Sequence, residues 1–438
     1  MKSLHIFPLF GSELMNGSEH YEFMLSKALV EQGVAVDVFA TRSNRIRLES
    51  AFSTAWPNDY PAGVERVAGM TVERFPVTFQ WPTALGSLFS QFILNRWGVE
   101  ERIHGAMLRG SLRQTDYFVR RGLTRPWIYD ALARAGLGPW SWPMLKRLQR
   151  VVRQYDVVLA GFMPFSLLPQ VVWIAHRQRV PVVLLPLFHP DDLYHYSTIL
   201  SRALADADGL LTLTPYSTEL IGRLWPQSRP RLVGAGVDLE DFLRPTVSGE
   251  RFRTTHGLGQ RRIVLYVGRK EPGKRYDLAL QAVDLLGRDD VMLVMIGADA
   301  DGIALDSPNV LYLNVLPRAD LIDAYDACDV LIMPSEHESF GMVILEAWVR
   351  GKPVIGNRSC GPVASLIQEG RDGFLCDTVE DFSRRLCEVL GDADLAHSLG
   401  AHGKAKVLER YNWRAVADRV LDVYRSVIAD GTNRAPAG

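Results

Sequence analysis

Short apolar runs that alternate with helical patterns are the feature that most restricts how this chain can fold. Residues 4–9 form an apolar run, a helical pattern follows and ends at Gly33, and the valines within 34–38 alternate as in a strand. Because strands that alternate with helices form parallel sheets covered on both faces, the sequence predicts an α/β fold with doubly wound sheets. The same alternation returns at 156–160, 180–186 and 209–214.

The alternation starts again after Arg262 and indicates a second domain. Its apolar runs occupy 263–268, 291–297, 309–314, 330–335, 353–356 and 373–377. A chain of 438 residues has room for two or three domains of about 150 residues each. One large sheet is the alternative, but the restart favours a first domain over 1–243 and a second over 244–411, with the boundary close to Pro245.

Composition excludes several classes of protein. The 49 Lys and Arg residues balance 50 Asp and Glu residues, and a net charge of -1 argues against a dedicated nucleic-acid binder. No apolar run approaches the roughly eighteen residues of a membrane-spanning helix, and the first residues lack the pattern of a signal peptide. No CxxC spacing suggests a zinc site or a disulfide framework, so we expect a cytoplasmic protein with reduced thiols. The four cysteines are Cys328, Cys360, Cys376 and Cys387.

Residues 82–150 interrupt the alternation, and we expect them to form a mostly helical insertion in the first domain. From Arg96 to Arg150 the sequence has an excess of Lys and Arg over Asp and Glu, with tryptophans between them. The interpretation that we favour is a packed elaboration with solvated arginines. The alternative is an acceptor-binding surface or a peripheral contact with the inner membrane face, because cationic and aromatic residues together suit anionic interfaces.

The strongest candidate site follows the expected strand 330–335, where the sequence ESFGMVILEA opens a helix. In open α/β sheets, ligands bind at the carboxyl ends of the strands, and the N–H groups at a helix N-terminus bind anions. Glu338 lies in the loop and Glu346 inside the helix, and carboxylates accept hydrogen bonds from vicinal hydroxyls of a ribose or a hexose. The alternative is one glutamate that complements the helix dipole and one on the surface. The candidate backbone donors belong to Phe340, Gly341, Met342 and Val343.

A second candidate site, GRKEPGK, follows the first strand of the second domain. Gly268 allows a tight turn, and Arg269 and Lys274 bring two cations to the same edge of the sheet. Two cations beside a helix N-terminus suit a diphosphate leaving group, whose developing charge they would neutralise. A solvated basic loop is the alternative, but two such motifs on neighbouring strand ends favour a site.

These two motifs together resemble the retaining glycosyltransferases of family 4, which have the GT-B fold of two Rossmann-like domains facing a cleft. The resemblance implies that a helix over about 412–431 crosses back to the first domain. The family usually has Lys-Gly where this chain has Lys274-Arg275, and a glutamate where Val363 and its neighbours stand. Further segments that resemble the family are 17–19, His189, Asp208, 214–217, 233–238 and 411–413.

The resemblance implies a retaining, metal-independent enzyme without a cofactor. A sugar would pass from a nucleoside diphosphate donor, held by the second domain, to a hydroxyl of a glycan, lipid-linked or small-molecule acceptor, held by the first. Arg269 and Lys274 would stabilise the diphosphate, and His189 would lie near the reacting carbon. The remaining contacts to the nucleotide sugar would come from Gly17, Gly268, Glu338, Phe340, Gly341, Met342, Val343 and Glu346.

Two other functions remain open from the sequence: a nucleotide-sugar epimerase with the same fold, and a non-catalytic partner subunit of a glycosyltransferase complex. Three Asp-x-Asp triplets have the form of a metal-binding signature found in another glycosyltransferase fold. None follows a strand in the context of that fold, so we predict that they bind no metal. The triplets are 206–208, 299–301 and 392–394.

Overall fold

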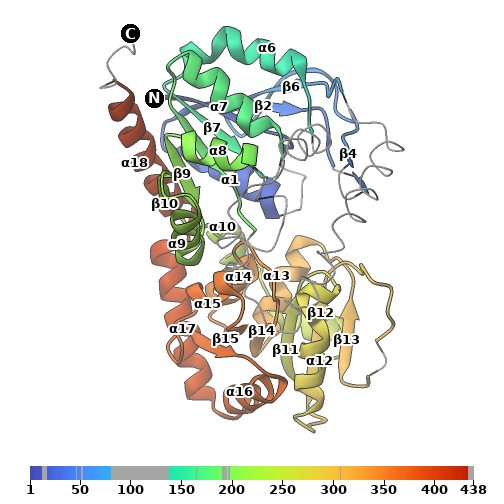
Figure 1. The fold of residues 1–438 in the computed structure, drawn as a ribbon. Helices are drawn as coiled ribbons and strands as arrows, with labels where there is room; N and C mark the ends of the chain where they lie inside the picture. Colours follow the sequence, from blue (N-terminus) through green and yellow to red (C-terminus); the bar gives the residue numbers. More distant parts are fainter. Residues whose placement is uncertain are drawn as a thin grey trace, which may run out of the picture. The chain divides into compact units, whose positions relative to one another are not determined.

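The protein divides into two compact units, each built on its own sheet (Figure 1). The first comprises Met1–Leu213, Ser217–Val233 and Ala417–Gly438, and the second Thr214–Tyr216 and Gly234–Val416. This computed structural model describes residues 1–11, 17–45, 47–50, 53–79, 138–163, 165–189, 195, 198–305 and 307–432.

The sheet of the first unit has eight strands, and all neighbours in it are parallel except one antiparallel pair at its end, β5 with β6. Its order reverses at β1, which lies between β7 and β2. The strands run in the order β10 (Pro230–Leu232), β9 (Gly209–Thr212), β8 (Val182–Leu185), β7 (Val157–Gly161), β1 (Lys2–Phe7), β2 (Ala35–Thr41), β6 (Met70–Phe75) and β5 (Gly63–Val67). A separate hairpin pairs β3 (Arg47–Ser50) with β4 (Ser53–Ala55).

Every residue of β7, β8 and β9 is buried, as expected for parallel strands that are covered on both faces. The described helical elements of this unit are α1 (Gly17–Glu31), α6 (Trp142–Val151), η1 (Val152–Gln154), α7 (Leu167–Arg177), α8 (Thr198–Asp206), α9 (Pro215–Leu224) and α18 (Trp413–Thr432). Of the expected insertion over 82–150, only 138–150 belong to the described residues, where Ser141 caps α6.

Helix α18 is fixed to the first sheet by packing and by a buried polar network. A Cβ on Gly209 of β9 would lie 3.2 Å from Val423 of α18, so the helix crosses the strand closely. The Nδ1 of His5 on β1 lies 2.7 Å from the Ser26 hydroxyl, and its Nε2 lies 3.2 Å from the Tyr424 hydroxyl. Burial lowers the pKa of His5 to about 3, so this histidine is neutral.

The sheet of the second unit has six strands, all parallel, and its order reverses at β11. The strands are β13 (Val310–Leu313), β12 (Val291–Ile296), β11 (Arg262–Val267), β14 (Val330–Met333), β15 (Val354–Asn357) and β16 (Gly373–Cys376). The helical elements are α10 (Leu239–Phe242), α11 (Gly249–Thr255), η3 (Pro272–Lys274), α12 (Tyr276–Asp284), α13 (Arg318–Ala327), α14 (Met342–Val349), α15 (Gly361–Leu366), α16 (Val379–Gly391) and α17 (Ala393–Arg410).

The continuous part of the second unit begins at Gly234, before the expected boundary at 243/244. The reason lies in α10, which packs on the second unit. Phe242 is fully buried with its ring 5.9 Å from that of Tyr325, and its carbonyl accepts a hydrogen bond of 2.7 Å from Arg350.

Helices α14 and α17 approach each other with no room for a side chain between them. A Cβ on Gly403 of α17 would lie 2.1 Å from the ring of Trp348 on α14, and one on Gly400 would lie 1.9 Å from the Gly351 carbonyl oxygen. Trp348 is fully buried, and its indole N–H donates a hydrogen bond of 2.8 Å to the Asp372 carbonyl. These contacts fix the position of α14.

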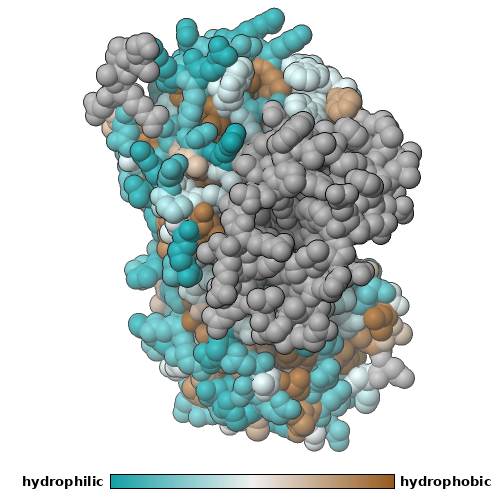
Figure 2. All heavy atoms as spheres, in the orientation of Figure 1, coloured by the Kyte–Doolittle hydropathy of each residue, from teal (hydrophilic) through white to brown (hydrophobic). Residues whose placement is uncertain are grey.

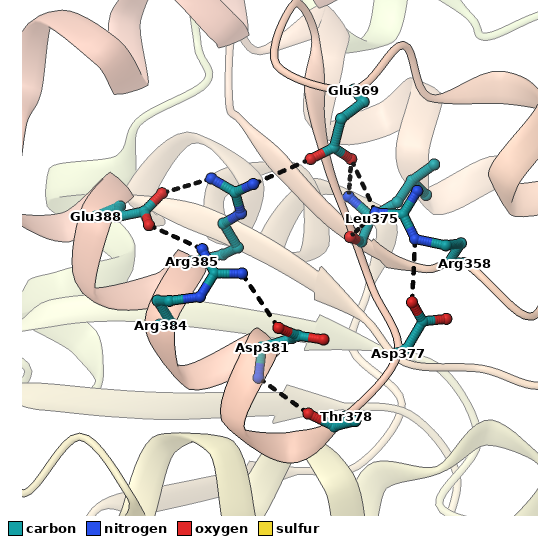
Figure 3. Close-up of polar contacts among 9 residues, drawn as sticks. All are labelled: Arg358, Glu369, Leu375, Asp377, Thr378, Asp381, Arg384, Arg385 and Glu388. Atoms are coloured by element: carbon teal, nitrogen blue, oxygen red, sulfur yellow. Dashed lines mark hydrogen bonds and ion pairs between the residues drawn. The ribbon is translucent and has the colours of Figure 1, made fainter.

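The edge of the sheet at β16 is covered by charged side chains (Figure 3). The Leu375 N–H donates a 2.7 Å hydrogen bond to Glu369, and the Leu375 carbonyl accepts one of 2.7 Å from Arg358. Arg385 extends the network by bridging Glu369 and Glu388. Side chains that occupy the polar groups of an edge strand hinder its pairing with another chain. On the face drawn in Figure 2, hydrophilic residues cover most of the described surface of this unit.

Within the described part of the chain, no helix combines the length and the apolar character that crossing a bilayer requires.

Candidate functional site

The two motifs of the second unit meet at the carboxyl ends of β11 and β14, which are neighbours in the sheet. The Lys274 ammonium donates a hydrogen bond of 2.8 Å to Glu338 and one of 3.3 Å to the His337 carbonyl. The side chains of Lys274 and Glu338 are 20% and 15% exposed, so this ion pair is partly shielded from water. The Glu336 N–H donates to the Gly273 carbonyl at 3.2 Å and joins the two loops a second time.

Arg275 occupies the position where family 4 usually has glycine, and its backbone explains that preference. Its φ of 50° and ψ of 41° lie in the left-handed region, which costs a side-chain-bearing residue about 1–2 kcal/mol. Its guanidinium pairs with Glu336 in the β14 loop and with Asp277 at 3.1 Å. The chain therefore combines a strained backbone position with a further contact between the two loops.

Arg269 is exposed at the same edge, and its guanidinium lies 3.0 Å from Glu271. The backbone before it is tightly enclosed. Gly297 has a φ of 150°, and a Cβ there would lie 2.0 Å from the Gly268 carbonyl oxygen. The ends of β11 and β12 therefore come together so closely that Gly297 has to be a glycine.

Gly341 is the N-cap of α14 and has a φ of 101°, which only glycine adopts readily. A Cβ there would lie 3.0 Å from Met333 of β14. Phe340 is buried, with its ring 6.0 Å from that of Tyr411. This turn places Met342 and Val343 in the first turn of the helix, where backbone N–H groups have no partner within the helix.

Glu346 lies one helical turn after Met342 and Val343 on α14 and accepts a hydrogen bond of 2.6 Å from the Tyr325 hydroxyl. Burial raises the pKa of Glu346, against the opposing effect of the Tyr325 hydrogen bond and the charge of Arg318. Only one carboxylate oxygen is engaged by Tyr325, so the other is placed to accept a further hydrogen bond. The sequence pattern does not point to Tyr325, because this residue comes from a different helix, α13.

The Asp-x-Asp triplets have structural partners. The buried Lys270 ammonium lies 2.7 Å from Asp299 and also pairs with Asp301, whose other oxygen accepts a 2.6 Å hydrogen bond from Tyr276. The hydrogen bonds from Lys270 and Tyr276 lower the pKa of Asp301 to about 2. Asp208 accepts from the Val182 N–H at 2.8 Å.

Asp392 caps α17. Among the described residues, no group of three or more His, Cys, Asp or Glu side chains is arranged to hold a metal ion.

Gly17 and His189 belong to the first unit, whereas the other candidate residues belong to the second. Gly17 is the first residue of α1, and nothing lies within 4 Å of where its Cβ would be. The backbone N–H of His189 donates a 3.1 Å hydrogen bond to Nδ1 of His195, a buried residue that the sequence analysis did not identify. Burial, followed by the nearby His189, lowers the pKa of His195 well below its ordinary value.

Comparison with known proteins agrees with this architecture. Residues 249–406 match the family model described as glycosyl transferases group 1. A D-inositol 3-phosphate glycosyltransferase from Saccharomonospora viridis is 27% identical over 98% of this chain and 93% of its own length. A GDP-mannose-dependent alpha-mannosyltransferase from Mycolicibacterium smegmatis is 32% identical, over 51% of this chain and 59% of its own length.

Two solved structures share the fold over the whole chain. The sucrose-phosphate synthase from Thermosynechococcus elongatus has a TM-score of 0.66 and 17% identity, covering 98% of this chain and 100% of its own. Anabaena HepE in complex with UDP and glucose has a TM-score of 0.63 and 16% identity, covering 97% and 99%. These likenesses confirm the GT-B fold class and the resemblance to family-4-like glycosyltransferases that the motifs indicated.

Proposed function

We propose that the chain transfers a sugar from a nucleoside diphosphate donor to a hydroxyl of an acceptor, with retention at the anomeric carbon. The donor would bind to the second unit and the acceptor to the first. The observation that carries the proposal is the contact between Lys274 and Glu338 at the ends of β11 and β14. A cation for the diphosphate and a carboxylate for the sugar hydroxyls are thereby held side by side. The names of the relatives, which include a GDP-mannose-dependent enzyme and a complex with UDP, support a nucleotide-sugar donor.

Lys274 is suited to hold the sugar site and the diphosphate together. Its ammonium has three N–H donors, of which Glu338 and the His337 carbonyl accept two. The third is available for a phosphate oxygen, and Arg269 adds a second cation at this edge. The negative charge on the diphosphate grows as the bond to the sugar breaks, so these cations stabilise the transition state more than the bound donor.

Helix α14 provides the remaining donor contacts. The N–H groups of its first turn, with Phe340 and Gly341 before it, suit an anion or a sugar oxygen. The oxygen of Glu346 that Tyr325 does not engage would accept a ribose hydroxyl. Glu338 would hold the donor sugar, and His189 of the first unit would orient it near the reacting carbon.

The transfer itself requires no nucleophile from the protein. The acceptor oxygen would bond to the anomeric carbon on the face from which the diphosphate leaves, while the acceptor proton passes to the departing phosphate oxygen. Two cations that take up the leaving charge, together with Asp-x-Asp triplets that have structural partners, support a reaction without a metal ion or a cofactor. Acceptor or membrane contact through 82–150 stays a prediction. Charge reversals in this segment should raise the acceptor KM and leave the donor KM unchanged. The arginines to reverse, which lie outside the described residues, are Arg109, Arg113, Arg120 and Arg121.

The first test is a panel of UDP-, GDP- and ADP-sugars in a thermal-shift assay. A donor at about one hundred times its Kd stabilises the protein by about 2.7 kcal/mol. Transfer with the stabilising donor should yield a product of unchanged anomeric configuration by NMR, and EDTA should leave the rate unchanged. Donor binding without turnover would indicate a non-catalytic subunit, and an altered sugar epimer would indicate an epimerase. Loss of activity in EDTA, restored by Mn²⁺, would contradict metal independence.

The second test is Lys274→Ala, for which we expect a fall in kcat of about 10²–10³-fold and a smaller change in donor affinity. Lys27→Ala is the matched control, because it breaks a surface Lys–Glu pair, with Glu31 at 3.7 Å, in the other unit. Its kcat should stay unchanged. Near-normal turnover by Lys274→Ala would refute the diphosphate role of this lysine.

A further inference from the structure

Arg275 and Glu336 form an ion pair beside the pair of Lys274 and Glu338. Both pairs join the loop after β11 to the loop after β14, and a hydrogen bond from the Glu336 N–H to the Gly273 carbonyl joins the same two loops. Two neighbouring residues of one loop thus meet two carboxylates, spaced two residues apart, of the other. Each of the two carboxylates, Glu336 and Glu338, thereby has a cation of the other loop as its partner.

The Arg275 contact is kept at the cost of backbone strain. A glycine at φ 50° would remove the strain of the left-handed conformation, yet the chain has arginine there. The guanidinium also pairs with Asp277, at 3.1 Å and 3.3 Å to its two oxygens, so Arg275 lies between two carboxylates. Such strain persists where the surrounding structure holds it, and it concentrates at functional sites.

Removal of Arg275 would leave Glu336 without its counter-charge in a loop that contains Lys274's own partner. The Glu336 N–H bonds to the carbonyl of Gly273, the residue before Lys274, and the Lys274 side chain is only 20% exposed. An unpaired Glu336 carboxylate would therefore compete for the Lys274 ammonium. A hydrogen bond from Lys274 to Glu336 would leave one fewer N–H donor for Glu338 or for a phosphate oxygen. The role of Arg275 would then be to neutralise Glu336.

We propose that Arg275 is a positioning residue that occupies Glu336 and thereby keeps Lys274 directed at Glu338 and the donor diphosphate. The inference rests on the proposed function, because it assigns Lys274 to the diphosphate. The inference goes beyond the proposed function, because the Arg275–Glu336 pair, which does not contact the donor, would influence the rate of transfer. It also predicts that arginine at this position and glutamate at 336 depend on each other.

The experiment compares Arg275→Gly, Glu336→Gln and the double variant in the full chain. Glycine fits the left-handed backbone, so Arg275→Gly should fold, and its melting temperature should stay close to that of the parent protein. Its kcat/KM should fall about 10-fold or more, since small displacements of catalytic groups cost up to about 10²-fold. The double variant should recover to within about 3-fold of the parent, because the competing carboxylate is gone.

Two further readouts separate this mechanism from loss of structure. The deficit of Arg275→Gly should appear mainly in kcat and should shrink with added salt, because salt screens the attraction of Glu336 for Lys274. Arg288→Gly is the matched control: Arg288 has the same exposed fraction as Arg275, 31%, and also pairs with an aspartate two residues later. Its kcat/KM should match the parent.

Binding of UDP and GDP, measured by calorimetry on the same proteins, separates a failure of the proposed function from a failure of the proposed role of Arg275. A parent protein that binds neither nucleotide and transfers no sugar would overturn the proposed function. A parent that binds and transfers, with an Arg275→Gly variant of equal kcat/KM or a double variant no better than the single one, would overturn the role of Arg275. If Arg275→Gly loses its fold, Arg275→Asn, which also tolerates the left-handed region, takes its place.

Discussion

Gly403→Ala is predicted to disturb the candidate site through the packing between α17 and α14. The new Cβ would lie 2.1 Å from Cδ1 of Trp348, and ordinary contact begins at 3.4 Å. The indole is not free to retreat, because it is fully buried and its N–H is bonded to the Asp372 carbonyl at 2.8 Å. The two helices must therefore separate, and α14 carries Glu346 and its first turn, to which we assign donor contacts, with it.

The magnitude follows from two opposing terms. Overpacking of a close-packed interior costs about 1–3 kcal/mol, and a contact this short belongs at the upper end. Alanine in place of glycine within a helix returns up to about 1 kcal/mol. A net loss of about 2 kcal/mol corresponds to a fall in melting temperature of roughly 4–8 °C for a domain of this size.

Gly391→Ala is the matched control, because Gly391 also lies in a helix and nothing is within 4 Å of where its Cβ would be. We expect an unchanged or slightly higher melting temperature for it. Calorimetric unfolding of the full chain measures both variants, and donor binding to Gly403→Ala should weaken alongside its stability. A Gly403→Ala protein as stable as the parent, with unchanged donor affinity, would refute the argument that Trp348 fixes α14.

Three further predictions concern buried or paired titratable groups. Glu22 is fully buried, and its carboxylate oxygens have no hydrogen-bond partner in the described structure; burial and then Glu19 raise its pKa well above the ordinary value. Glu22→Gln should therefore raise the free energy of unfolding at pH 7.5. Urea titrations should show that this gain shrinks towards pH 4.5. His5 is neutral in the folded protein but gains a proton below about pH 6.5 in the unfolded chain, so the free energy of unfolding should fall as the pH drops from 6.5 towards 3. His5→Gln should flatten this dependence on pH. The same slope in His5→Gln as in the parent protein would contradict a neutral, buried His5. Asp301→Asn should lower the melting temperature, because it removes a partner of the buried Lys270. Added Mn²⁺ should change the melting temperature of neither the parent protein nor the variant. A change with Mn²⁺ in the parent protein that is absent from Asp301→Asn would indicate that this triplet binds a metal.

The sequence predicted the second sheet closely, because buried parallel strands are continuous apolar runs. The expected strand at 263–268 is β11 (Arg262–Val267), and the others of that series coincide as well within a few residues. The antiparallel end of the first sheet was missed for the same physical reason. Residues of β5 (Gly63–Val67) are mostly exposed, so no apolar run marks them.

The part of the candidate site that follows directly from the strands was predictable, because residues just after two neighbouring parallel strands lie at the same edge of the sheet. Lys274 and Glu338 are the example. The site was not predictable where tertiary packing decides. Lys270 and Lys274 look equivalent in the sequence, yet Lys270 is buried in an ion-pair cluster and Lys274 faces the site. The left-handed backbone of Arg275 and the hydrogen bond from Tyr325 to Glu346 likewise depend on neighbours that the sequence does not place.

The membership of α18 in the first unit has a consequence for synthesis on the ribosome. The His5 ring on the first strand meets the Tyr424 hydroxyl, a partner that emerges from the exit tunnel only after the whole second unit has been made. Most of the second unit, Gly234–Val416, is a continuous segment that is complete before α18 emerges, and until then the His5 ring lacks the Tyr424 hydroxyl. In this chain the unit translated first is thus completed last, and its early strands depend on chaperones or on slow collapse for longer than their place in the sequence suggests.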